Sequence, residues 1–174
     1  MPEIFYMSRY NSPLGVYALV SSQKGIVCVK PEEHMKVDIN QWERDGITLE
    51  DRHEYNHRLA EELDSYFAGK LRQFNVPLDL RGTKFQLQVW ECLRQIPYAE
   101  TRSYGQIAHA IDRPTASRAV GRANGSNPIS IVVPCHRVIG ASGKLVGYGG
   151  GLDRKQALLD LEAKVFQKNP HPHR

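Results

Sequence analysis

Hydrophobic and polar residues follow two different periods along this chain, one typical of strands and one typical of helices. Near the N-terminus, three β-rich runs separated by turn residues predict an antiparallel meander over residues 4–10, 16–21 and 26–30. Further on, hydrophobic residues at helical spacing predict a helix over 52–68 that ends at Gly69. Residues 75–80 fit one more strand, whereas residues 31–51 are polar and irregular.

Helical periods dominate the second half of the chain. Thr83 is a suitable N-cap for a helix over 84–95, and Ser103 for a second helix over 104–111. A third helix is predicted over 113–123, because a proline near its start suits a first helical turn. Two short helices joined by a tight turn predict a helix-turn-helix.

The change of period near Gly82 marks a domain boundary. We expect a mixed α/β domain over 1–81 and a helical domain over 82–166, so the fold class is α/β in the α+β sense. The last residues, 167–174, include prolines and histidines at the chain end, and we expect a disordered tail there.

The composition narrows the class of protein. The 174 residues are 41% hydrophobic and 24% charged, which is ordinary for a globular protein that buries a core. No apolar run approaches the roughly 20 residues that span a bilayer, and no secretory leader is visible. We therefore expect no membrane partner and a cytoplasmic location, or a nuclear one in a eukaryote. A net charge of +4 favours polyanionic partners without proving one.

Three cysteines at wide spacing, Cys28, Cys92 and Cys135, argue against a disulfide scaffold, and no Cys-x-x-Cys pair suggests zinc. We expect no metal and no cofactor. Cys28 falls in a predicted core strand and Cys92 in an amphipathic helix, so both are interpreted as structural. Cys135 therefore remains as the candidate nucleophile.

Cys135 is followed directly by His136 and Arg137 within the run 133–139. Cysteine acts as a nucleophile in its thiolate form, and only a few per cent of a free thiol with a pKa of about 8.5 is ionised at neutral pH. A neighbouring base and a neighbouring cation could raise that fraction. These residues alone leave two interpretations open. Adjacent side chains on a strand point to opposite faces, so the pair could equally be a buried core cysteine beside a chance histidine.

Motifs on both sides of this cysteine occur in a definite order: Ser103–Ala108, Arg118–Gly121, Asn127-Pro128, Val133–Ile139 and Gly147–Leu152. With these motifs, the stretch from about Gly82 to Lys164 resembles the O6-alkylguanine-DNA alkyltransferase family, and Ser12–Gly15 resembles the start of its N-terminal domain. The resemblance implies a ribonuclease H-like N-terminal domain and a winged-helix-like helix-turn-helix domain.

The resemblance also implies a reaction. Cys135 would accept an alkyl group from O6-alkylguanine in a single-turnover transfer, with His136 as base through a bridging water and Glu162 orienting the imidazole. Asn127 matches the asparagine that braces the turn before the active site. The bridging water removes the objection that neighbouring side chains on a strand diverge.

Binding to DNA is implied for the helix-turn-helix, through the minor groove and with little sequence preference. Because a thiol cannot reach O6 of a stacked guanine, the target nucleotide must be flipped out. Arg118 matches the arginine that fills the vacated stack, and Tyr104 matches the tyrosine that helps to rotate the phosphate. Ser103 and Arg122 are also expected to contact DNA.

A pocket for the flipped base is implied as well. The Val138 amide and the Cys135 carbonyl would contact the base. The implied lining is Tyr148, Gly149 and Gly150. Some relatives have a serine at the Gly149 position; glycine cannot donate that hydrogen bond and leaves more room, so bulkier alkyl groups are expected to be tolerated.

Two other functions remain as alternatives. A non-catalytic protein that senses alkyl lesions in DNA would carry tryptophan in place of Cys135, and a cysteine hydrolase would not need a helix-turn-helix. The expected partner is double-stranded DNA that contains O6-alkylguanine, with O4-alkylthymine left open. The expected state is a monomer.

Overall fold

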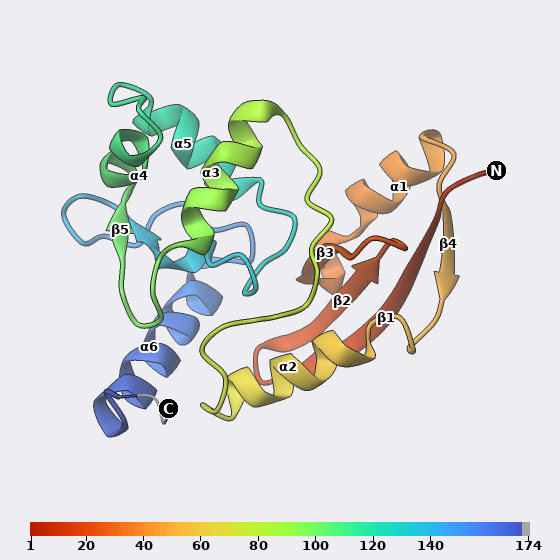
Figure 1. Ribbon diagram of the computed structural model, residues 1–174, viewed down its shortest axis with the longest axis horizontal. Helices are drawn as coiled ribbons and strands as arrows, with labels where there is room; N and C mark the ends of the chain where they lie inside the picture. Colours follow the sequence, from red (N-terminus) through yellow and green to blue (C-terminus); the bar gives the residue numbers. More distant parts are fainter. Residues whose placement is uncertain (172–174) are drawn as a thin grey trace. The chain divides into compact units, whose positions relative to one another are not determined.

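The computed structural model describes residues 1–171 and divides into two compact units, Met1–Arg81 and the residues from Gly82 onward. The first unit is built on a sheet whose first three strands are those that the sequence predicts (Figure 1). They are β1 (Ile4–Ser12), β2 (Gly15–Ser21) and β3 (Ile26–Pro31). β2 pairs antiparallel with both neighbours, so the predicted meander is confirmed.

Residues 31–51, irregular in the sequence, are largely regular in the structure. They include a 3₁₀ turn (Glu32–His34), helix α1 (Lys36–Arg44) and strand β4 (Thr48–Asp51). β4 adds a parallel pair with β1, which gives the strand order β3-β2-β1-β4. The helical period of α1 is hard to see because the helix has no fully buried residue, and its Val37 side chain is 75% exposed.

Both faces of the sheet are covered. The cluster on the α1 side consists of Phe5, Ala18, Val20, Val27, Cys28 and Met35. Tyr10 lies on the opposite face from Phe5, since side chains alternate along a strand, and its hydroxyl donates to Asp64 of helix α2 (His57–Phe67) at 2.7 Å. Burial on both faces explains why β2 is hydrophobic without alternation.

Two predicted elements of this unit need correction. The helix predicted over 52–68 begins only at His57, because a turn precedes it. The strand predicted over 75–80 is reduced to a single bridge between Ile26 and Leu78. Pro77, beside that bridge, has no N–H to donate, so the pairing does not extend into a ladder.

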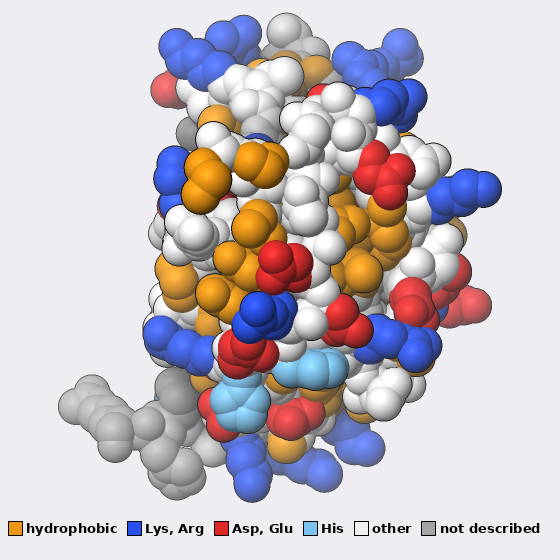
Figure 2. Space-filling model, turned by 90° about the vertical axis from the view of Figure 1, so that its right-hand side faces the viewer, with side chains coloured by type: hydrophobic (Ala, Val, Ile, Leu, Met, Phe, Trp, Pro, Cys, Tyr) orange, Lys and Arg blue, Asp and Glu red, His pale blue; other side chains and the backbone are white. Residues whose placement is uncertain are grey.

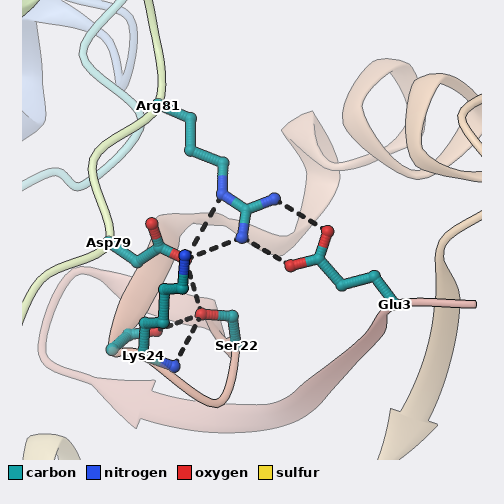
Figure 3. Close-up of polar contacts among 6 residues, drawn as sticks. Glu3, Ser22, Lys24, Asp79 and Arg81 are labelled. Atoms are coloured by element: carbon teal, nitrogen blue, oxygen red, sulfur yellow. Dashed lines mark hydrogen bonds and ion pairs between the residues drawn. The ribbon is translucent and has the colours of Figure 1, made fainter. Parts of the chain in front are cut away.

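The end of the first unit is fastened by Arg81 (Figure 3). Its guanidinium donates to both carboxylate oxygens of Glu3, at 3.0 and 2.5 Å, and to Asp79 Oδ2 at 2.7 Å. Asp79 in turn accepts a hydrogen bond from the Ser22 hydroxyl at 2.6 Å, and the guanidinium lies over the Phe5 ring. These contacts tie the last segment of the unit back to β1 and to the turn after β2.

The second unit is mainly helical, as predicted. Its helices are α3 (Lys84–Arg94), α4 (Tyr104–Ala110), α5 (Ser117–Gly125) and α6 (Leu152–Lys168). Its short elements are β5 (Arg102–Ser103), the 3₁₀ helix η2 (Cys135–Arg137) and β6 (Val138–Ile139). Thr83 and Ser103 cap α3 and α4 as predicted, each in a reciprocal capping box with a glutamine three residues on.

α4 and α5 form the predicted pair of short helices, and both α4 and α3 pack on α5 (Figure 1). α5 begins at Ser117 rather than at residue 113, because residues 113–116 close a separate turn in which the Ala116 amide donates to the Arg113 carbonyl at 2.9 Å. The indole N–H of Trp90 on α3 donates to the Ala123 carbonyl at 2.8 Å, which fixes α3 against α5.

The chain end also differs from prediction. α6 continues to Lys168, so residues 167 and 168 are helical and do not belong to a disordered tail. The rest of that prediction reaches residues 172–174, which lie outside the described residues. Among residues 1–171, no helix is both long enough and apolar enough to cross a bilayer.

Candidate active site

The candidate nucleophile, Cys135, opens the 3₁₀ helix η2 and is only 3% exposed. The extended conformation expected for the run around Cys135 is therefore wrong at residues 135–137. Burial raises the pKa of the Cys135 thiol to about 11, although hydrogen bonding from Asn127 and the charge of Lys155 act in the opposite direction. At neutral pH the resting thiol is protonated, so it needs a base before it can act as a nucleophile.

His136 faces the interior and is completely buried. Its Nε2 lies 3.0 Å from Glu162 Oε2 on α6. Arg137 reaches the same carboxylate, with Nε donating to Oε1 at 2.7 Å, while its Nη1 donates to the Ile96 carbonyl at 2.7 Å. η2 and α6 are thus joined through one buried carboxylate that serves both a histidine and an arginine.

The electrostatics of this cluster favour a neutral imidazole. Burial lowers the pKa of His136 and outweighs the opposing effect of Glu162. Burial by itself would raise the pKa of Glu162, but the hydrogen bonds from His136 and Arg137 and the positive charge of Arg137 act in the opposite direction, and the pKa is lowered. The buried Nδ1 of His136 has no hydrogen-bond partner among the described residues. A neutral ring with a free nitrogen is equipped to take up a proton.

The lowered pKa of His136 predicts that acid destabilises the protein. Below the ordinary histidine pKa of 6.5, His136 is protonated in the unfolded chain, whereas its lowered pKa keeps it neutral in the folded chain. The free energy of unfolding therefore falls as pH falls. Urea denaturation between about pH 7.5 and pH 5 measures this slope. His136→Gln cannot titrate and should show a shallower slope; equal slopes for the two proteins would contradict the assignment.

Two asparagines brace the nucleophile. Asn127 accepts from the Ile129 amide at 3.0 Å and donates to the Val133 carbonyl at 2.9 Å. Asn124, on the last turn of α5, donates to the Cys135 carbonyl at 3.3 Å. Asn127 was expected from the sequence, but Asn124 was missed, because only the tertiary fold brings the end of α5 beside η2.

Lys155 is a second residue that the sequence did not reveal. It is fully buried on α6, and its ammonium donates to the Val138 carbonyl at 2.5 Å and the Val146 carbonyl at 3.0 Å. Its charge also lowers the pKa of Cys135. A signal was present: Lys155 and Glu162 are seven residues apart with Leu158 between them, which places all three on one helix face.

Two of the expected pocket residues, Tyr104 and Val138, lie close to Cys135, and both already make hydrogen bonds to backbone carbonyls. The Tyr104 hydroxyl donates to the Val146 carbonyl at 2.7 Å, and burial together with the nearby Cys135 raises the pKa of Tyr104. The Val138 amide donates to the Cys135 carbonyl, so the two groups expected to contact the base contact each other here. Ser103 serves as the N-cap of α4, one residue before Tyr104.

Two glycines of the glycine-rich segment, Gly149 and Gly150, leave little room for a side chain. A Cβ at Gly150 would lie 2.9 Å from the Tyr148 ring, so a larger residue would displace that ring. A Cβ at Gly149 would lie 3.3 Å from the Gly125 carbonyl at the end of α5, which leaves little slack. A serine at this position would therefore need a small shift of the segment.

The remaining expected residues, Arg118 and Arg122, lie one turn apart on α5 and are exposed. Neither makes an ion pair or side-chain hydrogen bond with the part of the chain that the structure describes, and neither joins the Cys135 cluster. They form a separate basic surface on α5, the helix whose last turn carries Asn124.

The other cysteines stand apart from this cluster. Cys28 is buried in the sheet of the first unit, where burial raises its thiol pKa, and Cys92 is partly exposed on α3. Within residues 1–171 there is no group of three or more His, Cys, Asp or Glu side chains placed to hold a metal ion.

Two family models together match most of the chain. Residues 5–80 match the ribonuclease-like domain of 6-O-methylguanine DNA methyltransferase, and residues 84–164 match its DNA binding domain. The chain belongs to the 6-O-methylguanine DNA methyltransferase family.

Individual relatives agree with this assignment. The methylated-DNA–protein-cysteine methyltransferase of Methanosarcina acetivorans is 45% identical over 90% of this chain and 97% of its own length. That of Mycolicibacterium paratuberculosis is 68% identical, but the match spans 60% of this chain and 64%, less than two thirds, of that protein. Mycobacterium tuberculosis OGT, solved in complex with DNA, superposes with a TM-score of 0.80 at 47% identity, covering 93% of this chain and 94% of that one.

Proposed function

We propose that this protein repairs DNA by moving the alkyl group of O6-alkylguanine in duplex DNA onto Cys135. The observation that carries the proposal is the buried cluster of Cys135, His136 and Glu162, in which a protonated thiol adjoins a neutral histidine held by a carboxylate. The M. tuberculosis structure with DNA and the names of the relatives support it.

The reaction is a direct displacement. The Cys135 sulfur forms a bond to the alkyl carbon as that carbon's bond to O6 breaks, and guanine leaves. The thiol proton passes to His136 through a water, and a proton is returned to the departing guanine, so protons balance. Glu162 stabilises the imidazolium while it exists, and Arg137 keeps Glu162 ionised. The product thioether is a very poor leaving group, so each molecule reacts once.

For the pocket, we propose that the flipped base lies against Tyr104 and the segment of Tyr148, Gly149 and Gly150. The Val138 amide and Cys135 carbonyl would share their hydrogen bonds with the base edge. Gly149 supplies no side-chain donor, so discrimination against bulkier alkyl groups should be weak.

For DNA binding, we propose that α5 enters the minor groove, with Ser103 at the start of α4 and Arg122 contacting phosphates. The exposed arginines of α5 lack protein partners among the described residues, which leaves them free for phosphates. On the face drawn in Figure 2, acidic and basic side chains are interspersed around hydrophobic ones in the middle, and further basic side chains lie at the edges. We propose a monomer that acts where DNA is, in the cytoplasm or, in a eukaryote, the nucleus.

Mass spectrometry of the intact protein tests the reaction. After incubation with an excess of duplex that contains O6-methylguanine, we expect one added methyl group per molecule, located on Cys135 by peptide mapping. A protein that only senses lesions would bind this DNA and gain no mass. Continued turnover without a protein adduct would indicate a hydrolase and would overturn the proposal.

A second experiment tests base flipping. Arg118→Ala should slow repair of duplex DNA by roughly 10- to 100-fold, because filling the vacated stack offsets an unstacking cost of a few kcal/mol. Its reaction with free O6-benzylguanine should be unchanged, since a free base needs no flipping. Second-order rate constants on both substrates measure the difference.

Arg122→Ala is the matched control one turn along α5. As a phosphate contact it should weaken DNA binding and reduce the logarithmic salt slope by about 0.9, without a specific defect in flipping. Equal losses for Arg118→Ala on duplex and free base would assign that arginine to folding or to the pocket instead.

A further inference from the structure

The backbone immediately before the nucleophile has an unusual conformation at Ile131. Its φ is +73°, in the left-handed region, although isoleucine is β-branched. The Val132 amide donates to the Ser130 carbonyl at 2.8 Å, which closes a three-residue γ-turn centred on Ile131. A γ-turn with positive φ at its centre is rare and strained, so the surrounding structure must hold it in place.

The restraints on this turn are visible on both sides of it. Ile129, Ile131 and Val133 are buried, with 2% exposure or less. The Val133 amide donates to the Ile129 carbonyl at 3.0 Å, which closes a loop around the γ-turn. The side chain of Asn127 bonds to the backbone of the same two residues, Ile129 and Val133. The ends of the turn are thus fixed while its centre is strained.

The turn is coupled directly to Cys135. The Val133 carbonyl accepts the Cys135 amide at 2.8 Å, and this closes a second γ-turn around Pro134, whose φ of −80° and ψ of 62° are relaxed for that turn. Only Val133 and Pro134 separate the strained turn from the nucleophile. A change of backbone direction at Ile131 is therefore passed to Cys135 with no flexible residue between them.

We propose that Ile131 is a positioning residue: the left-handed backbone at this position aims Cys135 at the alkyl carbon, and the buried isoleucine side chain holds the backbone there. This inference rests on the proposed alkyl transfer. A displacement at carbon needs the sulfur in line with the breaking bond, and small errors of placement cost large factors in rate. The isoleucine thus acts through Cys135 and does not touch the substrate.

Comparing the reaction rates and stabilities of an alanine and a glycine variant at position 131 distinguishes this role from ordinary packing. Ile131→Ala keeps the penalty for a left-handed backbone but removes the buried anchor, so the turn should relax and the reaction with free O6-benzylguanine should slow by roughly tenfold or more. Ile131→Gly removes more of the side chain but favours positive φ, so it should react faster than Ile131→Ala and be at least as stable. Ile131→Val, which keeps the branched side chain, should stay close to wild type.

Ile129 provides the matched control, since it is buried in the same loop and is not among the described residues with positive φ. At position 129 the alanine variant should be the better of the two: Ile129→Gly should be less stable and less reactive than Ile129→Ala. Melting temperatures and second-order rate constants for all five variants, measured well below each melting temperature, give both orders. If the alanine variant at position 131 is more stable and more reactive than the glycine variant, as expected at position 129, Ile131 only fills space and the proposal is wrong.

Reaction with iodoacetamide measures the reactivity of the Cys135 thiol without the orientation that alkyl transfer requires, because this small reagent does not use the base pocket. In Ile131→Ala its rate should stay the same or rise, since a relaxed turn exposes the thiol, while the O6-benzylguanine rate falls. A parallel fall of both rates would overturn the proposal. If wild type itself fails to react with O6-benzylguanine or with methylated duplex, the proposed function fails instead, and the stability order at position 131 still reports on the strained turn.

Discussion

Replacement of Cys135 by serine is expected to abolish alkyl transfer while leaving binding to alkylated duplex DNA intact. Serine is nearly isosteric with cysteine and fits the buried site, but its hydroxyl is a far weaker nucleophile near neutral pH. The arginines that we propose to contact DNA lie on α5 and make no contact with the thiol, so their surface should not change. Intact mass after incubation with methylated duplex and an equilibrium binding titration measure the two properties on the same variant.

Cys92→Ser is the control for loss of a thiol elsewhere in the same unit. Cys92 is partly exposed on α3, and its replacement should leave both transfer and binding at wild-type levels. If Cys135→Ser loses affinity for DNA as severely as it loses transfer, nucleophile and DNA surface are not separable in the way that the structure suggests.

Glu162→Gln is expected to have the largest effect on stability. The amide keeps the shape of the side chain but removes the charge that two buried neighbours share, and it leaves Arg137 without a counter-charge. Breaking a buried ion pair from one side typically costs about 3–5 kcal/mol of unfolding free energy. The reaction with free O6-benzylguanine should also slow on the order of 10²-fold, because His136 loses the carboxylate that supports it as a base.

Asp160→Asn makes the same chemical change on the same helix at an exposed position, where the Asp160 carboxylate accepts a hydrogen bond from the Gln156 amide and, among the described residues, from no other side chain. It should alter the urea midpoint and the rate very little. A Glu162→Gln protein as stable as Asp160→Asn would mean that the buried carboxylate does not balance Arg137. If Glu162→Gln had normal stability but a reduced rate with O6-benzylguanine, Glu162 would support the reaction without stabilising the fold.

Much of this fold follows from local patterns. The first three strands, the long apolar faces of the helices and the caps at Thr83 and Ser103 are set by residues close together in the chain, so they could be predicted. α1 and β4 were missed because their side chains are mostly exposed or half-buried. Their pattern lacks a strong period, and the parallel pairing of β4 with β1 joins residues more than forty positions apart.

From the sequence we could predict the family and, through the resemblance to it, a candidate nucleophile, its histidine and a supporting glutamate. How these residues meet could be seen only in the folded protein. The tertiary structure folds Cys135 into a 3₁₀ turn instead of a strand, shares Glu162 between His136 and Arg137, and buries Lys155 between two backbone carbonyls. Burial and hydrogen-bond partners come from segments far apart in the chain, and they set the protonation states on which the proposed chemistry depends.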